Sequence, residues 1–271
     1  MSETEKVRRH YAPEPLWARI ERLLSDAGLS QRPLDPGALS ALDHFHSGGF
    51  AATAFLADWA KIPRGSRVLD IGSGFGGPAR YLAAARGCDV TGIDLTEEYV
   101  EVAERLTGLC GLAGKVHFQV GDALSPAFPD RSFDVVWTQH VAMNIRDRDR
   151  FYRQAARVLI PGGHFITYDI VINEPSAPLP YPMPWAENSA ISSLRSLPQT
   201  EGLIAASELR ILEIRDVSKD MSAWFDQSRL SAAAQVNLAA IMKPSFVEAV
   251  ANLRKSIQSG LISPVMIKAE R

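Results

Sequence analysis

Three glycines, Gly72, Gly74 and Gly76, follow Asp70 where the short apolar run Val68–Ile71 must turn into a helix. Glycine at such a turn lets the backbone pass close beneath a ligand, because no Cβ stands in the way. A carboxylate directly before the turn adds a negative charge at the same point. These residues predict a site for a nucleotide-like cofactor at the end of a strand.

The glycine loop alone is compatible with two cofactors, NAD and S-adenosylmethionine. Gly72, Gly74 and Gly77 also satisfy the dinucleotide-binding pattern, and Asp94 lies at about the distance expected of its ribose-binding acid. Asp70, however, would repel a pyrophosphate, whereas it could organise the cationic methionine end of a sulfonium cofactor. The carboxylate therefore favours S-adenosylmethionine over NAD.

Two further features point the same way. Gly121–Ala123 follows the third predicted strand and places Asp122 where its carboxylate can accept a hydrogen bond from an exocyclic adenine amine. One helix and one strand follow the predicted sheet, which leaves no room for the separate substrate domain of a dehydrogenase. We therefore expect S-adenosylmethionine, with S-adenosylhomocysteine as its product.

A second group of polar residues ends the fourth predicted strand, at Gln139 and His140, on the side where a methyl group would be transferred. His140 is the leading candidate for a base, because an unperturbed imidazole pKa of about 6.5 suits proton removal near neutrality. Asp169 on the fifth strand could orient that ring or bind a cationic substrate. The alternatives are that His140 only orients substrate or caps a strand, and that Asp169 makes a structural hydrogen bond. Further residues expected at the acceptor pocket are Met143, Asn144, Tyr168, Trp185, Trp224 and Phe225.

Strands and helices alternate along the chain and must position these residues. The apolar patterns predict strands at 68–71, 90–94, 116–120, 133–138, 164–172, 209–217 and 261–268, and helices at 14–30, 78–86, 97–111, 147–159, 200–207, 221–230 and 244–260. Such alternation predicts an α/β fold with a doubly wound, mostly parallel sheet. Its binding crevice lies at the carboxyl ends of the strands.

Composition limits the kinds of partner. The 271 residues are 46% hydrophobic and 22% charged with a net charge of −2, and no run of Lys or Arg forms a basic stripe, so nucleic acid is not expected. The opening stretch Met1–Trp17 lacks the apolar core of a secretory signal, and no segment approaches about 18 continuous apolar residues, so neither export nor a membrane partner is expected. Cys88 and Cys110 are expected to be core thiols in a cytoplasmic protein without a metal site. The sequence is compatible with a homo-oligomer.

The motifs together resemble those of class I methyltransferases that use S-adenosylmethionine. The resemblance rests on the glycine loop, Asp94, Gly121–Ala123 and the turn Pro161–Gly163. The segments 43–50 and 137–145 resemble, more closely, the sarcosine and dimethylglycine methyltransferase branch. It implies a Rossmann-like, seven-stranded sheet with an antiparallel last strand and a helical cap. It also implies methyl transfer to a small-molecule acceptor, with nitrogen slightly favoured over carbon or oxygen and a non-catalytic, cofactor-binding scaffold or sensor as the alternative.

The resemblance also implies roles for individual residues. Gly72, Gly74 and Gly76 line the methionine half of the cofactor, Asp94 holds the ribose diol, Leu95 lies against adenine and Asp122 binds the adenine amine. The full set expected to bind the cofactor is His46, Gly48, Asp70, Gly72, Gly74, Gly76, Asp94, Leu95, Asp122, Ala123 and Gln139. Residues 1–60 form a helical segment that closes over the cofactor, and residues 61–271 form the methyltransferase domain, with cap insertions at about 173–200 and 219–259.

Overall fold

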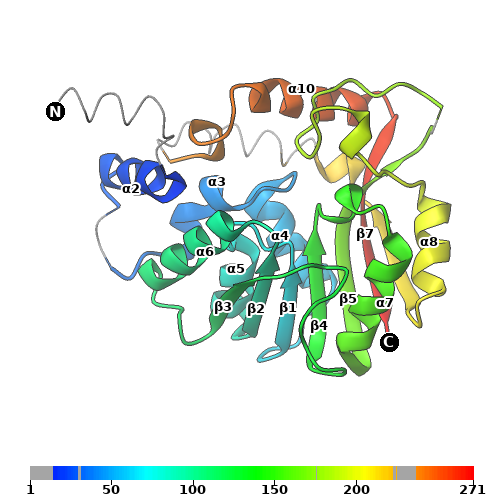
Figure 1. Ribbon diagram of the computed structural model, residues 1–271, viewed down its shortest axis with the longest axis horizontal. Helices are drawn as coiled ribbons and strands as arrows, with labels where there is room; N and C mark the ends of the chain where they lie inside the picture. The colour runs from blue at the N-terminus through cyan, green and yellow to red at the C-terminus, as the bar shows by residue number, and fades with distance from the viewer. Residues whose placement is uncertain (1–14, 30–31, 175, 222–223, 225–235) are drawn as a thin grey trace.

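A seven-stranded sheet forms the centre of the computed structural model, which describes residues 15–29, 32–174, 176–221, 224 and 236–271 (Figure 1). The strand order is β3-β2-β1-β4-β5-β7-β6. The strands are β1 Arg67–Ile71, β2 Asp89–Asp94, β3 Val116–Val120, β4 Phe133–Gln139, β5 Leu159–Ile172, β6 Arg210–Asp216 and β7 Ile262–Glu270. Strands β1 to β5 pair in parallel, whereas β7 is antiparallel to both β5 and β6. The expected mostly parallel sheet with an antiparallel last strand is confirmed.

Helices cover both faces of this sheet and the carboxyl ends of its parallel strands. The α-helices are α2 Leu16–Asp26, α3 Ser40–Asp43, α4 Gly49–Trp59, α5 Gly77–Arg86, α6 Glu97–Leu109, α7 Arg148–Val158, α8 Leu197–Ala205 and α10 Ser245–Gln258. Short 3-10 turns are η1 Pro36–Leu39, η2 Ala142–Asn144, η3 Ser189–Ile191 and η4 Leu238–Ala240. None of the helices in the described part of the chain is long and apolar enough to cross a membrane.

The apolar strand residues alternate between two cores because successive side chains of a strand point to opposite faces. On β1, Val68 packs into the core formed with α4 and α5, whereas Leu69 packs into the core formed with α7 and α8. On β5, Ile166 packs into the core with α4 and α5, whereas Phe165 packs into the core with α7 and α8. Both faces are therefore buried, which explains the nearly continuous apolar strands.

Several boundaries differ from those that the sequence predicts, as at the end of α2, which stops at Asp26, and two of the differences have a clear local cause. Strand β5 begins at Leu159, not at His164, because Leu159 pairs with Phe133 and the turn at Pro161–Gly163 bulges out before His164 pairs with Val135. Helix α8 begins at Leu197 because Ser196 and Gln199 form a capping box. The helix predicted at 221–230, with Phe225, lies largely outside the described residues.

A third apolar cluster joins the N-terminal helices to the segment before α10. Leu16, Ile20 and Leu24 of α2 pack with residues of η1, α3 and α6 and with Leu238 and Ile241. Figure 1 shows α2, α3 and α10 gathered at the end of the sheet where β1 and β4 terminate. This packing places segments far apart in sequence around one end of the strands.

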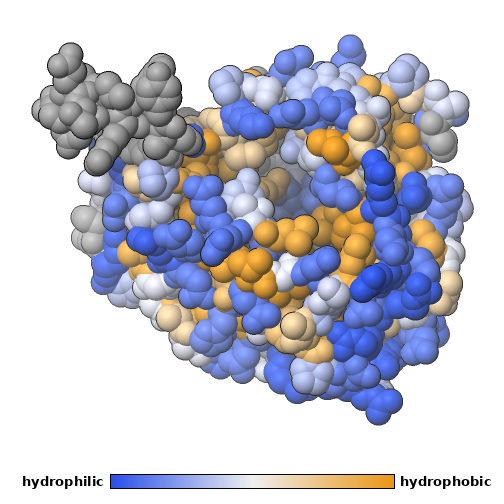
Figure 2. All heavy atoms as spheres, viewed as in Figure 1, coloured by the Kyte–Doolittle hydropathy of each residue, from blue (hydrophilic) through white to orange (hydrophobic). Residues whose placement is uncertain are grey.

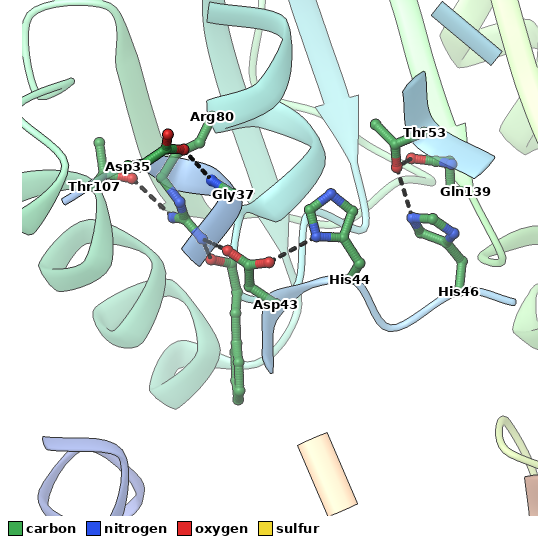
Figure 3. Close-up of polar contacts among 10 residues, drawn as sticks. Asp35, Gly37, Asp43, His44, His46, Thr53, Arg80, Thr107 and Gln139 are labelled. Atoms are coloured by element: carbon green, nitrogen blue, oxygen red, sulfur yellow. Dashed lines mark hydrogen bonds and ion pairs between the residues drawn. The ribbon is translucent and has the colours of Figure 1, made fainter. Parts of the chain in front are cut away.

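A buried ion pair ties the N-terminal segment to the sheet-covering helices (Figure 3). Arg80 Nη2 donates to Asp43 Oδ2 at 2.8 Å, and both side chains are almost fully buried. Asp43 Oδ1 accepts from His44 Nδ1 at 2.6 Å, and Arg80 Nη1 donates to Thr107 Oγ1 at 3.0 Å. The guanidinium of α5 thus connects α3 to α6.

We expect Arg80→Met to lower the free energy of unfolding by about 3–5 kcal/mol, because it leaves the Asp43 carboxylate buried without its cation. The measurement is urea unfolding followed by circular dichroism. The matched control is Arg67→Met, which breaks the partly exposed pair with Asp134 and should cost less than about 1 kcal/mol. Equal losses in the two variants would contradict the role given to Arg80.

Candidate cofactor and acceptor site

A cavity of about 680 Å³ opens at the carboxyl ends of β1, β2 and β4. Figure 2 shows this face of the molecule hollowed between α10 and the strand tips, with hydrophobic residues around the opening. The predicted site residues that line the cavity are His46, Asp70, Gly72, Gly74, Asp94, Leu95, Asp122, Ala123, Gln139, His140, Met143, Asn144 and Trp185. Thirteen predicted site residues from distant parts of the sequence therefore line the same cavity.

The glycine loop is shaped by left-handed backbone and by close neighbours. Gly72 has φ 73°, and a Cβ there would lie 2.3 Å from Val141 Cγ2. Gly76, the N-cap of α5, has φ 79°, and a Cβ there would lie 2.4 Å from the Phe118 ring. Both positions therefore require glycine for packing as well as for backbone conformation. Gly76 itself faces Phe118 and is not among the cavity-lining residues.

Asp94 joins the glycine loop to the end of β2. Its Oδ2 accepts a hydrogen bond from the backbone N–H of Gly74 at 3.0 Å, and its Oδ1 accepts from that of Thr96 at 2.9 Å. Each carboxylate oxygen retains a lone pair for a further donor. Leu95 beside it is 71% exposed at the cavity mouth, and Asp122 Oδ1 accepts from the Leu124 N–H.

Asp70 is buried at the end of β1 with an unusual ionisation. Burial, and then the neighbouring charge of Asp94, raise the pKa of Asp70 from 3.8 to about 7. Its Oδ2 has no hydrogen-bond partner among the described residues. A cationic group in the cavity would offset the cost of ionising this carboxyl group.

Gln139 is oriented by neighbours from two elements (Figure 3). Its Oε1 accepts from Trp137 Nε1 at 3.1 Å and from Thr53 Oγ1 at 3.2 Å, and Thr53 also contacts His46 Nε2 at 2.9 Å. Because an indole can only donate, Trp137 fixes which end of the amide is oxygen. Gln139 Nε2, which has no partner in the described part of the chain, is left available as a donor at the cavity.

His140 directly follows β4 and has a left-handed backbone conformation with φ 56°. Its backbone N–H donates to the Tyr168 carbonyl at 2.7 Å, and its ring packs 4.7 Å from the Tyr168 ring. Burial lowers the pKa of His140 to about 3, so the value near 6.5 assumed from the sequence is wrong for this buried ring. The imidazole is therefore neutral at ordinary pH, and its Nε2 has no partner among the described residues.

Five predicted site residues do not line the cavity. They are Gly48, Gly76, Tyr168, Asp169 and Trp224. Tyr168 lies behind the wall, where its hydroxyl donates to the Ser47 carbonyl at 3.2 Å. Asp169 follows Tyr168 on β5 and points to the opposite face, where it accepts from Thr167 Oγ1 and from the Ala142 N–H. Trp224 packs against Phe55, and its ring fills the space above Gly48.

Several lining residues are additional to the predicted set, namely Phe45, Ser73, Tyr99, Val141, Arg146 and Met242. Ser73 and Val141 stand between predicted residues, and Phe45 lies in the segment 43–50, so their positions within the motifs could have indicated them. Tyr99 on the first turns of α6 and Met242 before α10 carry no such signal, because only tertiary packing brings them here.

Comparison with known proteins identifies the family. Residues 69–167 match the family model described as a methyltransferase domain. Methyltransferase GfsG from Streptomyces halstedii is 31% identical over 182 residues, which are 66% of this chain and 66% of that protein. The chain belongs to the class I methyltransferases that use S-adenosylmethionine. This confirms the family that the sequence motifs indicate.

Other matches describe the range of this family. The 27-O-demethylrifamycin SV methyltransferase of Amycolatopsis mediterranei is 40% identical over 117 residues, 43% of each chain. The matched regions cover about two thirds or less of the first curated relatives of this methyltransferase.

Solved structures share the fold at low sequence identity. A structure assigned as a sarcosine dimethylglycine methyltransferase from Galdieria sulphuraria has TM-score 0.67 and 18% identity, covering 81% of this chain and 84% of that one. The [4+2]-cyclase SpnF has TM-score 0.66 and 24% identity, covering 96% and 97%. At these identities the likeness extends to the fold of this methyltransferase and no further.

The cavity of this methyltransferase fits S-adenosylmethionine by the chemistry of its unpaired atoms. Asp70 Oδ2, Ser73 Oγ and Gln139 Nε2 are buried, line the cavity and have no partner among the described residues. Buried polar groups are costly unless they are hydrogen-bonded, so these atoms call for a polar ligand. An amino acid moiety with a neighbouring positive charge offers suitable donors and acceptors.

We expect Asp94→Ala to weaken S-adenosylmethionine binding by a few kcal/mol, because the role expected of Asp94 is to accept the ribose hydroxyls and because it accepts the hydrogen bond that orders Gly74. Isothermal titration calorimetry measures the change. The control is Asp89→Ala, at the opposite end of β2, which loses only an exposed contact with Lys115. Unchanged cofactor affinity in the Asp94 variant would remove that assignment.

We also expect cofactor binding to weaken as the pH falls below about 7, by up to about tenfold per pH unit, because a cation binds best to ionised Asp70. Calorimetric titrations at pH 6 and pH 8 of the wild type and Asp70→Asn test this. The α-amino group of the ligand titrates in both proteins, so the difference between them isolates Asp70. Identical pH dependence in the two proteins would contradict the role of this carboxylate.

The same raised pKa predicts how the free protein responds to pH. Because folded Asp70 holds its proton up to about pH 7 and the unfolded chain only to about pH 4, the stability contributed by Asp70 is lost as pH rises through this interval. Asp70→Asn should therefore gain stability relative to the wild type between pH 4 and pH 8. Parallel curves of melting temperature against pH would show that Asp70 ionises normally.

Proposed function

We propose that this methyltransferase transfers a methyl group from S-adenosylmethionine to a hydroxyl group of a small molecule, with His140 accepting the hydroxyl proton. The observation that carries the proposal is the Nε2 atom of His140. It is buried on the wall that also holds Asp70 and Gln139, and it has no partner among the described residues. A hydroxyl group placed there would donate its hydrogen bond to this nitrogen.

The cofactor, when bound, supplies an electrophilic methyl group on a sulfonium. An acceptor hydroxyl has to lose its proton, and the neutral imidazole of His140 can take that proton at Nε2 as the oxygen becomes acidic. The low pKa of His140, caused by burial, means that the ring returns the proton to solvent and is neutral again for the next turnover. The hydrogen bond to the Tyr168 carbonyl and the Tyr168 ring hold His140 in place.

The preference for a nitrogen acceptor stays a prediction from the branch resemblance. The names of relatives specify oxygen, carbon and nitrogen as the methylated atom, so they do not choose among the three. Asp169, the residue expected to bind a cationic substrate, lies outside the cavity lining. This absence from the wall favours a neutral hydroxyl over an ammonium. The 27-O-demethylrifamycin relative supports oxygen methylation of a natural product.

A non-catalytic scaffold or sensor that binds the cofactor is the competing proposal from another class. The structure named as the [4+2]-cyclase SpnF does not support a non-catalytic role, because its name describes an enzyme with another reaction on the same fold. The position of His140 against the cavity favours catalysis.

We expect His140→Ala to lower kcat about 100-fold or more while leaving cofactor affinity unchanged, because only the proton acceptor is removed. The assay follows transfer of a carbon-13 methyl group to matched phenols and anilines by NMR. The control is His164→Ala, which removes a half-buried histidine of β5 that does not line the cavity.

The outcomes of this assay separate the proposals. Wild-type turnover in the His140 variant would show that His140 is not the base and that catalysis depends on positioning the acceptor against the cofactor. Methylation of anilines but not of phenols would contradict the proposal and show that the acceptor atom is nitrogen. Cofactor binding without transfer to any acceptor in the panel or in a metabolite extract would favour the sensor.

A further inference from the structure

A second space of about 730 Å³ lies beside the cofactor cavity, under α2 and the start of α10. We call it the side chamber and define it by Leu16, Met183, Trp185, Ile241, Met242 and Phe246. Tyr99, Pro184, Trp185 and Met242 line both spaces. The side chamber therefore adjoins the cavity along an edge that these four residues share.

Contacts between distant segments hold the side chamber together. The Leu16 N–H at the start of α2 donates to Glu98 Oε1 of α6 at 2.9 Å, and Arg19 Nη2 donates to the Ile241 carbonyl at 2.6 Å. Asn252 of α10 donates to the Pro182 carbonyl at 3.0 Å, next to Met183. The walls come from four parts of the chain that are fixed to one another.

Most residues that line the side chamber are apolar, and its charged side chains already make contacts within the protein. Four charged side chains occur among its described lining residues. Arg19 and Glu98 make the backbone contacts above, and Lys243 pairs with Glu187 at 2.9 Å on the exposed rim. The remaining wall is dominated by aromatic, aliphatic and thioether side chains. Such a wall favours ligands that present an apolar surface.

We propose that the side chamber binds the distal, uncharged and apolar part of the methyl acceptor, while its reacting group lies in the cofactor cavity at His140. This rests on the proposed function, because it divides one acceptor between the two spaces. The acceptor is thus a molecule with a hydroxyl at one end and an extended hydrocarbon or aromatic body at the other. Tyr99, Trp185 and Met242 lie on the edge shared by the two spaces, where the acceptor would cross, and would select it by shape.

Binding of phenol, 4-butylphenol and 4-octylphenol to the protein saturated with S-adenosylhomocysteine tests the proposal by calorimetry. Affinity should rise by up to about fourfold for each methylene that enters the chamber. A chain of equal length that ends in a carboxylate, 8-(4-hydroxyphenyl)octanoate, should lose most of this gain.

Two variants narrow the chamber at exposed positions, where folding is not at stake. Ile191→Trp and Ser245→Trp should reduce the gain with tail length at least tenfold for 4-octylphenol and leave phenol and S-adenosylhomocysteine binding unchanged. The matched control is Val247→Trp, on the same helix as Ser245, 67% exposed and outside the chamber lining.

The proposal is overturned if affinity does not rise with tail length, if it rises equally in the narrowed variants, or if the carboxylate-ended chain binds as tightly as 4-octylphenol. Because the product of the cofactor is used, binding needs no turnover. A tail-length effect that the narrowed variants abolish, together with no methylation of any phenol, would support the chamber and contradict hydroxyl transfer.

Discussion

The burial of Asp70 at the end of β1 is the constraint on which the site depends. The carboxyl group is surrounded by protein, has Asp94 as its neighbour, and has a pKa of about 7 in the free protein. Ionising it without a cation is unfavourable, so the folded protein carries a cost that a positively charged ligand relieves. The glycine turn that follows is what permits a ligand to come close enough to do so.

The same burial shifts the two main titratable groups of the cavity in opposite directions. It raises the pKa of the Asp70 carboxyl and lowers that of the His140 imidazole, so both groups favour their neutral forms. Pairs of groups shifted apart by their surroundings often divide the work of a site. Under the proposed function, the carboxyl group responds to the cation of the cofactor and the imidazole to the proton of the acceptor.

The covering segments complete the site by different interactions. The N-terminal segment is fixed by the buried Asp43–Arg80 pair and brings His46 to Thr53 and Gln139. The segments around Trp185 and Met242 are held by apolar packing and form the wall between the cofactor cavity and the side chamber. Polar contacts thus position the cofactor end, whereas apolar contacts shape the acceptor end.

The sequence by itself determined the alternation of strands and helices from residue 67 onward, the mostly parallel sheet, and many of the residues that meet at the carboxyl ends of the strands. Those features depend on local signals: apolar runs with period two, glycines at a strand-to-helix turn, and carboxylates at strand ends such as Asp94 and Asp122. Because parallel strands bring their carboxyl ends to one edge, these local signals were enough to place the residues together.

Only the tertiary structure decided which protonation states His140 and Asp70 favour. It also decided that the Asp169 side chain points away from the cavity and that Tyr99 and Met242 line it. Desolvation depends on every segment packed around a group, and the sequence near that group does not contain this information. The side chamber has the same origin, since its walls come from segments more than two hundred residues apart that meet through long-range packing.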